Sequence, residues 1–125
     1  MVGELRATGA ITVFGHGRAR RQFIDISDYA EVVCFCAERN TISSGFLLAP
    51  VVGREVSTIQ EIAQKLLDLS GGGEINFDAT KPDPPDQFID PEILKLKLGC
   101  GVNIGLDDSL RAALSGPTLG KKIFI

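Results

Sequence analysis

Residues 57–73, STIQEIAQKLLDLSGGG, carry the clearest secondary-structure signal in the chain. Their apolar residues recur at the spacing of one helical face, at Ile59, Ile62, Ala63, Leu66 and Leu67. Ser57 and Gln60 form a predicted capping box, and the glycine run at 71–73 ends the helix. We therefore expect a helix whose apolar face packs on the protein core.

The segments after this helix alternate between strand, loop and helix signals. EINFDA (74–79) predicts a strand, and the proline-rich stretch 80–90 predicts a loop, because proline excludes helical hydrogen bonding. A helix follows, with Asp90 as N-cap, Pro91 at its first position and Gly99 as terminator. A last helix is expected over 106–114, followed by a tail that ends in a short strand.

The segments before it predict a hairpin, a helix and a buried strand. Residues 10–26 read as a hairpin that turns at the glycines of GHG. Residues 28–39 carry helical apolar spacing, with Ser27 as N-cap. FLLAPVV (46–52) is wholly apolar and suits a strand of a covered parallel sheet. The sequence thus predicts a mixed α/β chain forming one domain over residues 1–125.

Composition excludes several classes of protein. The formal net charge of −3 argues against a general nucleic-acid or membrane-surface binder. The chain has three cysteines, of which Cys34 and Cys36 would point to nearly opposite helix faces, so we expect free thiols in a reducing compartment. No signal peptide or membrane span is recognisable, and we expect a cytoplasmic protein.

The arginines beside the GHG turn form the first candidate site. Arg18, Arg20 and Arg21 offer planar donor forks that match phosphate oxygens, and a glycine turn lets the backbone approach a ligand. Strand alternation places Arg20 and Arg21 on opposite faces, so at most part of the cluster meets one ligand. A solvated charged hairpin is the alternative.

Other polar residues have structural interpretations beside functional ones. His16, in a tight turn, is expected to be exposed, and Asp25 and Asp28 are spaced for helix capping. Lys81 and Asp83 could contact a ligand or belong to a solvated loop.

Signatures of cofactor chemistry are missing from the sequence. No glycine-rich dinucleotide fingerprint opens a helix, and no P-loop, nucleophile elbow or zinc-ligand spacing occurs. Tyr29, the single tyrosine, is followed four residues later by Val33, so no Tyr-x-x-x-Lys pair exists.

Three collinear segments resemble extended short-chain dehydrogenases/reductases of the NAD-dependent epimerase/dehydratase family. These are VFGHGRARRQFIDISDYA (13–30), GREVSTIQEIAQKL (53–66) and the stretch 75–114 that contains TKPD. The TKPD motif resembles that of the GDP-L-fucose synthase branch, whose members are GDP-4-keto-6-deoxymannose epimerase/reductases. The resemblance covers about residues 9–114, and the tail 115–125 lies outside it.

The resemblance implies an α/β fold equivalent to the C-terminal substrate-binding lobe of an extended Rossmann-type reductase, without the N-terminal dinucleotide-binding half. It implies that Arg21, Phe23 and Lys81 bind a nucleotide sugar, with a GDP-sugar favoured over a UDP-sugar. NADP serves the parent family, and no cofactor site is expected in this chain. The helix 28–39 and the strand 46–52 would then expose an apolar face that an N-terminal Rossmann partner or a second copy could cover.

The sequence departs from the family pattern at several positions near the expected diphosphate. The family's acidic residue after the arginine is Gln22 here, its tyrosine or histidine is Asp25, and its basic pair after TKPDG is Asp86 and Gln87. A carboxylate in place of a cation opposes anion binding. Two functions therefore remain open: a nucleotide-sugar-binding fragment of an epimerase/reductase that is inactive alone, and a non-catalytic interaction or structural module derived from that family.

Overall fold

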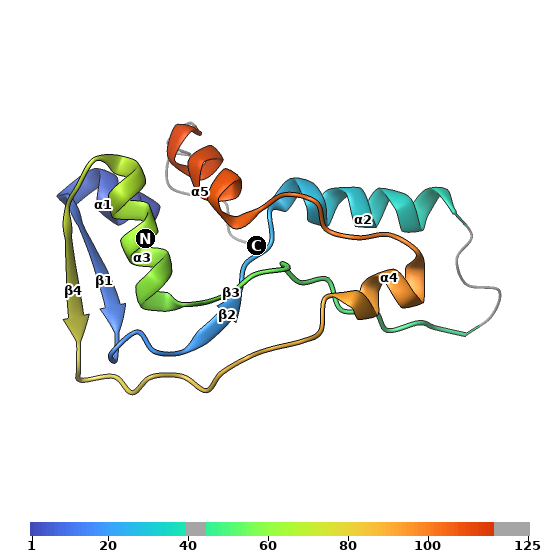
Figure 1. Ribbon diagram of the computed structural model, residues 1–125, viewed down its shortest axis with the longest axis horizontal. Coiled ribbons are helices and arrows are strands. Elements are labelled where there is room, and N and C mark those ends of the chain that lie inside the picture. The colour runs from blue at the N-terminus through green and yellow to red at the C-terminus, as the bar shows by residue number, and fades with distance from the viewer. Residues whose placement is uncertain (40–44, 117–125) are drawn as a thin grey trace.

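The computed structural model describes residues 1–39 and 45–116 of the chain. Figure 1 shows an elongated molecule, with α1, α3, α5, β1 and β4 at one end, α2 and α4 at the other, and β2 and β3 between them. The arrangement confirms the expected mixed α/β chain. In chain order the elements are α1 (Val2–Thr8), β1 (Ala10–Phe14), β2 (Arg20–Gln22), α2 (Ile26–Glu38), β3 (Val56–Thr58), α3 (Ile59–Ser70), β4 (Glu74–Asp78), α4 (Glu92–Leu98) and α5 (Leu106–Ser115).

The first core joins α3 to the parallel strand pair β1–β4. Ile11 and Val13 of β1 are fully buried, because alternate residues of a strand point to the same face. They cluster with the apolar face of α3, which confirms the predicted helix. The buried members of this core are Leu5, Ile11, Val13, Ile62, Ala63, Leu66, Leu67 and Leu106.

The capping box of α3 lies one residue later than predicted. Thr58, not Ser57, accepts the Glu61 N–H at 3.1 Å, and the Glu61 carboxylate accepts the Thr58 N–H at 2.7 Å. Ser57 is buried in β3, where it pairs with Arg21 of β2. This pairing holds Ser57 in an extended conformation, so the helix begins only after Thr58.

The predicted hairpin over residues 10–26 is wrong, although its turn is confirmed. Gly15 and Gly17 have φ of 65° and 69°, which favours glycine. However, β1 pairs in parallel with β4, and β2 pairs antiparallel with β3, so the two strands belong to different sheets. Each strand finds a partner distant in sequence instead of its neighbour.

The helix α2 begins at Ile26, two residues before the predicted start. Its N-cap is Asp25 rather than Ser27: the Asp25 carboxylate accepts the Ser27 N–H at 2.8 Å. Hydrogen bonds from the Ser109 hydroxyl and then from the Ser27 N–H hold the pKa of Asp25 below its ordinary value. Capping was therefore the correct interpretation of Asp25.

A second core lies between α2 and α4. Its buried apolar residues are Val32, Leu94 and Val102. Beside it, Asp28 is only 1% exposed and accepts the N–H groups of Asn103 at 3.1 Å and Ile104 at 2.8 Å. Asp28 thus joins α2 to the segment that leads into α5, instead of capping its own helix.

The segment after residue 45 does not form the strand predicted over 46–52. A strand of a parallel sheet needs neighbouring strands, and none of the described residues pairs with this segment. Pro50 also lacks an N–H for a ladder. Phe46 and Leu48 are consequently 90% and 75% exposed.

The two C-terminal helices follow the expected pattern closely. α4 begins at Glu92 rather than Pro91, with the Asp90 carboxylate accepting the Glu92 N–H at 3.0 Å, and Gly99 ends it in the left-handed conformation. α5 matches the expected 106–114 to within one residue. The predicted strand in the tail falls within 117–125, outside the described residues.

Candidate functional site

Arg21 lines a cavity between β2, the segment at Val52 and the loop 86–89. The cavity has a volume of about 460 Å³. Its lining residues are Arg21, Gln22, Val52, Asp86, Gln87, Phe88 and Ile89. This lining combines apolar side chains with polar groups that could orient a small ligand. We call this cavity the Arg21 pocket.

The Arg21 guanidinium is held by backbone carbonyls. Its Nη1 donates to the carbonyl oxygens of Pro85 at 2.7 Å and Arg20 at 2.8 Å. Its Nη2 and Nε groups have no hydrogen-bond partner among the described residues. Arg21 is half-buried, and these two bonds hold its guanidinium in place with donors left over for a ligand.

The wall opposite Arg21 is a loop fastened to β2 by side chains. Gln22 donates to the carbonyls of Ile89 at 2.8 Å and Gly53 at 3.0 Å, and its Oε1 accepts the Ile89 N–H at 2.8 Å. A carboxylate at position 22 could accept but not donate. Gln22 thus joins β2 to both neighbouring segments.

Asp86 fastens the same loop through Arg20. Its carboxylate accepts the Arg20 backbone N–H at 2.8 Å and the Arg20 Nε at 2.9 Å. These bonds, the backbone one first, hold the pKa of Asp86 below its ordinary value. Asp86 is therefore ionised near neutral pH, with its hydrogen bonds going to Arg20 and a weaker charge interaction with Arg21.

The three site residues inferred from the sequence do not all line this cavity. Phe23 is 42% exposed and contributes no lining atom, while its carbonyl oxygen lies against Gly53. The Lys81 ammonium lies 3.8 Å from the centroid of the Phe14 ring. Of these three residues, only Arg21 lines the Arg21 pocket. The binding roles assigned to Arg21, Phe23 and Lys81 stay predictions.

Sequence reasoning missed the apolar half of the pocket. Phe88 and Ile89 reach it because the loop 86–89 lies along β2, and Val52 lies beside Gly53, whose carbonyl accepts a bond from Gln22. No local pattern signals that placement, since loop 80–90 reads only as proline-rich. Gln22, Asp86 and Gln87 were visible as departures from the family pattern.

His16 and Asp83 hold the glycine turn. Asp83 Oδ1 accepts the backbone N–H of His16 at 3.0 Å, and the His16 Nδ1 lies 3.5 Å from Asp83 Oδ2. The His16 ring is exposed, as expected from its turn. The pair supports the loop and presents no nucleophile to a ligand.

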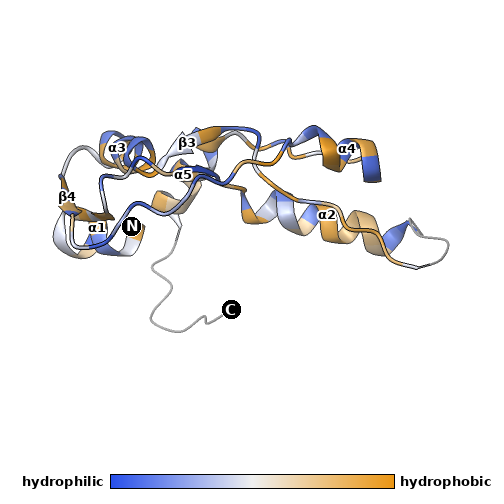
Figure 2. Cartoon of the chain, turned by 90° about the horizontal axis from the view of Figure 1, so that it is seen from below, coloured by the Kyte–Doolittle hydropathy of each residue, from blue (hydrophilic) through white to orange (hydrophobic). Residues whose placement is uncertain are grey.

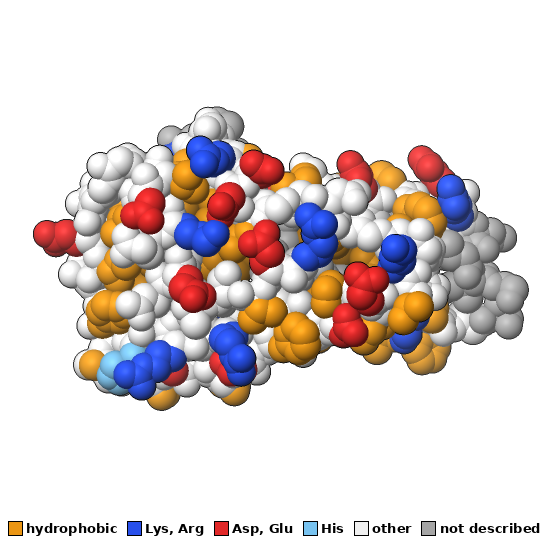
Figure 3. Space-filling model, viewed as in Figure 1, with side chains coloured by type: hydrophobic (Ala, Val, Ile, Leu, Met, Phe, Trp, Pro, Cys, Tyr) orange, Lys and Arg blue, Asp and Glu red, His pale blue; other side chains and the backbone are white. Residues whose placement is uncertain are grey.

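The rest of the described surface carries few signs of other chemistry. Figure 3 shows acidic and basic side chains interspersed over one face, without a continuous basic patch. Among residues 1–39 and 45–116, no group of His, Cys, Asp and Glu is placed to hold a metal ion. None of the described helices is long and apolar enough to cross a membrane.

Known proteins resemble the chain over most of its length. No protein-family model matches it. GDP-L-fucose synthase 1 of Arabidopsis thaliana is 30% identical over 111 residues, which are 86% of this chain and 33% of that protein. The chain thus spans about a third of the length of this curated relative.

Solved structures show the same fold. RMD from Pseudomonas aeruginosa, complexed with NADPH, matches with a TM-score of 0.72 at 19% identity, over 91% of this chain and 38% of that one. UDP-glucose 4-epimerase from Bifidobacterium longum, in complex with NAD+ and UDP, matches with a TM-score of 0.76 at 16% identity, over 90% of this chain and 36% of that one. The chain thus resembles a GDP-L-fucose synthase in sequence over 86% of its own length, and its fold is that of part of an NAD-dependent epimerase or reductase.

Proposed function

We propose that the chain binds the nucleoside diphosphate part of a nucleotide sugar in the Arg21 pocket. The observation that carries this proposal is the geometry of Arg21, which is fixed by two carbonyls and keeps donors free beside a cavity of about 460 Å³. A guanidinium fork matches the oxygens of a diphosphate. A GDP-sugar is favoured because the curated relative is a GDP-L-fucose synthase.

The relatives act on nucleotide sugars with NAD(P), but the described residues do not fit that cofactor. A dinucleotide diphosphate binds where a parallel strand leads into a helix N-terminus. Here β1 leads into the Gly15–Gly17 turn and β4 into the proline-rich loop. We therefore assign no hydride-transfer step to these residues, and the role of the chain in the proposal is to hold and orient substrate.

Asp86 sets the expected strength of binding. Its carboxylate lines the pocket and would repel a diphosphate, whereas the Arg20 guanidinium beside it reduces that repulsion. A charge pair in partly shielded surroundings contributes on the order of 1 kcal/mol. We expect micromolar rather than nanomolar affinity.

Calorimetric titration with GDP, UDP and their sugars tests the proposal. We expect binding of GDP that Arg21→Ala abolishes and that Asp86→Asn strengthens by about fivefold, because the substitution removes a negative charge from the pocket. Arg18→Ala is the matched control, since it removes the same charge from the turn without touching the pocket. No binding at millimolar ligand would refute the proposal.

A second candidate function is a non-catalytic interaction module, and the apolar surface at the α2 end favours it. A groove of about 380 Å³ lies between α2, α4 and the extended segment 47–51. No backbone–backbone hydrogen bond to residues 46–52 is found in the described part of the chain, although the Leu48 carbonyl accepts a bond from Lys97 Nζ at 2.7 Å. Figure 2 shows hydrophobic residues along much of α2. Extended apolar backbone without a ladder is a template for strand pairing with another chain.

Sedimentation analysis separates the two functions. If the chain is an interaction module, it should associate with itself or with a Rossmann-type partner, and Phe46→Ser with Leu48→Ser should abolish the association. Phe88→Ser is the control, because Phe88 is also exposed but lies in the Arg21 pocket. A monomer at all concentrations that also fails to bind such a partner would eliminate this second function.

A further inference from the structure

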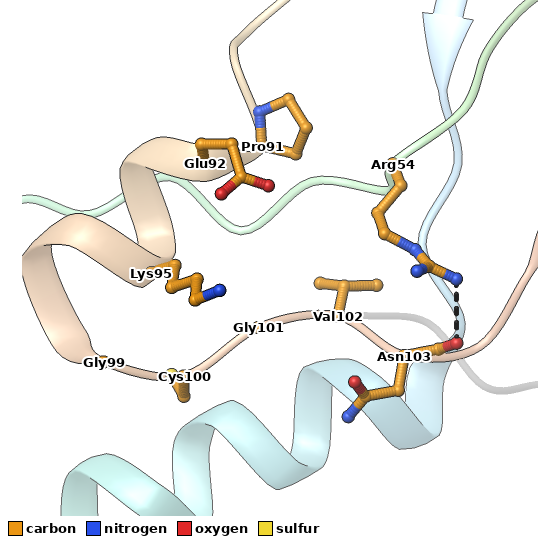
Figure 4. Close-up of a pocket in the computed structure, with 9 residues that line it drawn as sticks. All are labelled: Arg54, Pro91, Glu92, Lys95, Gly99, Cys100, Gly101, Val102 and Asn103. Atoms are coloured by element: carbon orange, nitrogen blue, oxygen red, sulfur yellow. Dashed lines mark hydrogen bonds between the residues drawn. The ribbon is translucent and has the colours of Figure 1, made fainter.

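A second polar cavity lies beneath α4, away from the Arg21 pocket. Its volume is about 290 Å³, and it shares no lining residue with the Arg21 pocket. Its walls are Arg54, Glu92, Lys95 and the loop Gly99–Asn103 (Figure 4). We call it the Lys95 pocket. Nothing in the proposed binding of a nucleotide sugar uses it.

The loop that forms the floor of the Lys95 pocket is held from both sides. Gly99 turns the chain out of α4 with φ of 74°, and Asp28 accepts the N–H groups of Asn103 and Ile104. Between these anchors, the N–H groups of Gly101 and Val102 have no hydrogen-bond partner among the described residues, whereas that of Cys100 bonds to its own thiol. Successive free amides can line an anion-binding concavity.

The charged side chains around this floor are only partly neutralised. Arg54 donates one bond, from Nη2 to the Asn103 carbonyl at 3.0 Å. Figure 4 shows the Lys95 ammonium and the Glu92 carboxylate extending toward the same space. Neither makes an ion pair with a described residue. Within the cavity lining, two cations therefore face one carboxylate, and the other carboxylate near this loop, Asp28, is bonded to the amides of Asn103 and Ile104.

Cys100 adds no negative charge to the wall. Burial raises the pKa of its thiol, so the thiol is protonated near neutral pH. It therefore neither repels an anion nor acts as a reactive thiolate.

The geometry points to a binding site for a small phosphate-bearing anion in the Lys95 pocket. The Lys95 ammonium supplies the compact charge, the Arg54 guanidinium supplies its unused N–H groups, and the amides of Gly101 and Val102 supply neutral donors. Glu92 weakens the site, because its carboxylate repels an anion. The ligand is either inorganic phosphate or the phosphate group of a small monoester, since a cavity of about 290 Å³ has room for either.

Amide NMR of the 125-residue chain, recorded while a phosphate compound is added at constant ionic strength, tests this site. Inorganic phosphate and glycerol 3-phosphate are the two probes, and tighter binding of one identifies the source of the phosphate group. We expect saturable shifts at residues 95 and 100–102. Lys95→Gln should weaken binding about fivefold, and Glu92→Gln should strengthen it about fivefold, as expected for one nearby charge.

The control is Arg111→Gln, which removes the same charge from a residue outside the pocket. Equal weakening by Arg111→Gln and Lys95→Gln would show nonspecific attraction and overturn the site. An absence of saturable shifts at 100–102 below about 50 mM phosphate would also overturn it. Amide shifts at residues 20–22 and 86–89 on addition of GDP report on the Arg21 pocket. Failure of one site is therefore distinguishable from failure of the other.

Discussion

Substitution of Asp28 should destabilise the whole chain, because this carboxylate joins α2 to the segment that leads into α5. Asp28 is 1% exposed and accepts two backbone N–H groups, at 3.1 Å from Asn103 and 2.8 Å from Ile104. Asp28→Ala leaves both donors without a partner. A buried donor left unsatisfied costs about 1–3 kcal/mol, so the expected loss is about 3–5 kcal/mol.

Asp28→Asn distinguishes the lost hydrogen bonds from lost side-chain volume. Its amide keeps one acceptor oxygen but turns an NH₂ group toward a second donor, so we expect a loss of about 1–3 kcal/mol. This milder variant also remains informative if Asp28→Ala does not fold. Urea unfolding followed by circular dichroism measures both free energies of unfolding.

Glu31→Ala is the matched control for these variants. Glu31 is an exposed carboxylate on the same helix and makes no hydrogen bond to a described residue. Its removal should change the free energy of unfolding by no more than about 0.5 kcal/mol. If Asp28→Ala costs no more than this control, the inferred link between α2 and the segment before α5 is refuted.

Three further predictions concern local structure. Thr58→Ala should lower the free energy of unfolding by about 1 kcal/mol through loss of the N-cap, whereas Gln60→Ala should have little effect; thermal unfolding measures both. Gly53→Ala should lower the melting temperature, because a Cβ there would lie 1.8 Å from the Phe23 carbonyl oxygen, and an unchanged melting temperature would contradict that contact. Because the pKa of Asp86 is lowered in the folded chain, its bonds to Arg20 stabilise the fold above the ordinary aspartate pKa and are lost as the pH falls through the lowered value. Between about pH 6 and about pH 3, the free energy of unfolding in urea should therefore fall less for Asp86→Asn than for the unchanged chain.

Helices were predictable from sequence where local signals agree. The apolar spacing of α3, its glycine terminator and the Gly99 end of α4 all depend on residues within a few positions of each other. The short helix α1 was missed because it has seven residues and a single buried one, Leu5. Its position depends on packing against β1 rather than on a local pattern.

Strand pairing was less predictable, because it depends on distant partners. β1 finds β4 more than sixty residues away, and the alternation within 10–26 cannot reveal that choice. The error over 46–52 has the opposite cause, since the sequence is typical of a covered strand but no described strand pairs with it, and only Ala49 and Val51 pack against the second core. The sequence thus predicts the apolar character of this segment correctly and its pairing in a sheet incorrectly.

The candidate site was predictable only in part. Arg21 follows from its place in the family pattern, and the structure puts a cavity beside it. The apolar wall could not be inferred, because it forms when Gln22 and Asp86 fasten a loop to β2 from more than sixty positions away. The same departures from the family pattern that argue against a diphosphate are thus the residues that shape the pocket.

Binding of a nucleoside diphosphate beside Arg21 is tested most directly by amide NMR of the labelled chain during titration with GDP. We expect saturable shifts at residues 20–22 and 86–89, and their loss in an Arg21→Gln variant whose spectrum otherwise remains that of the folded chain. Shifts that persist unchanged in Arg21→Gln, or their absence at about 5 mM GDP, would contradict a diphosphate site at this arginine.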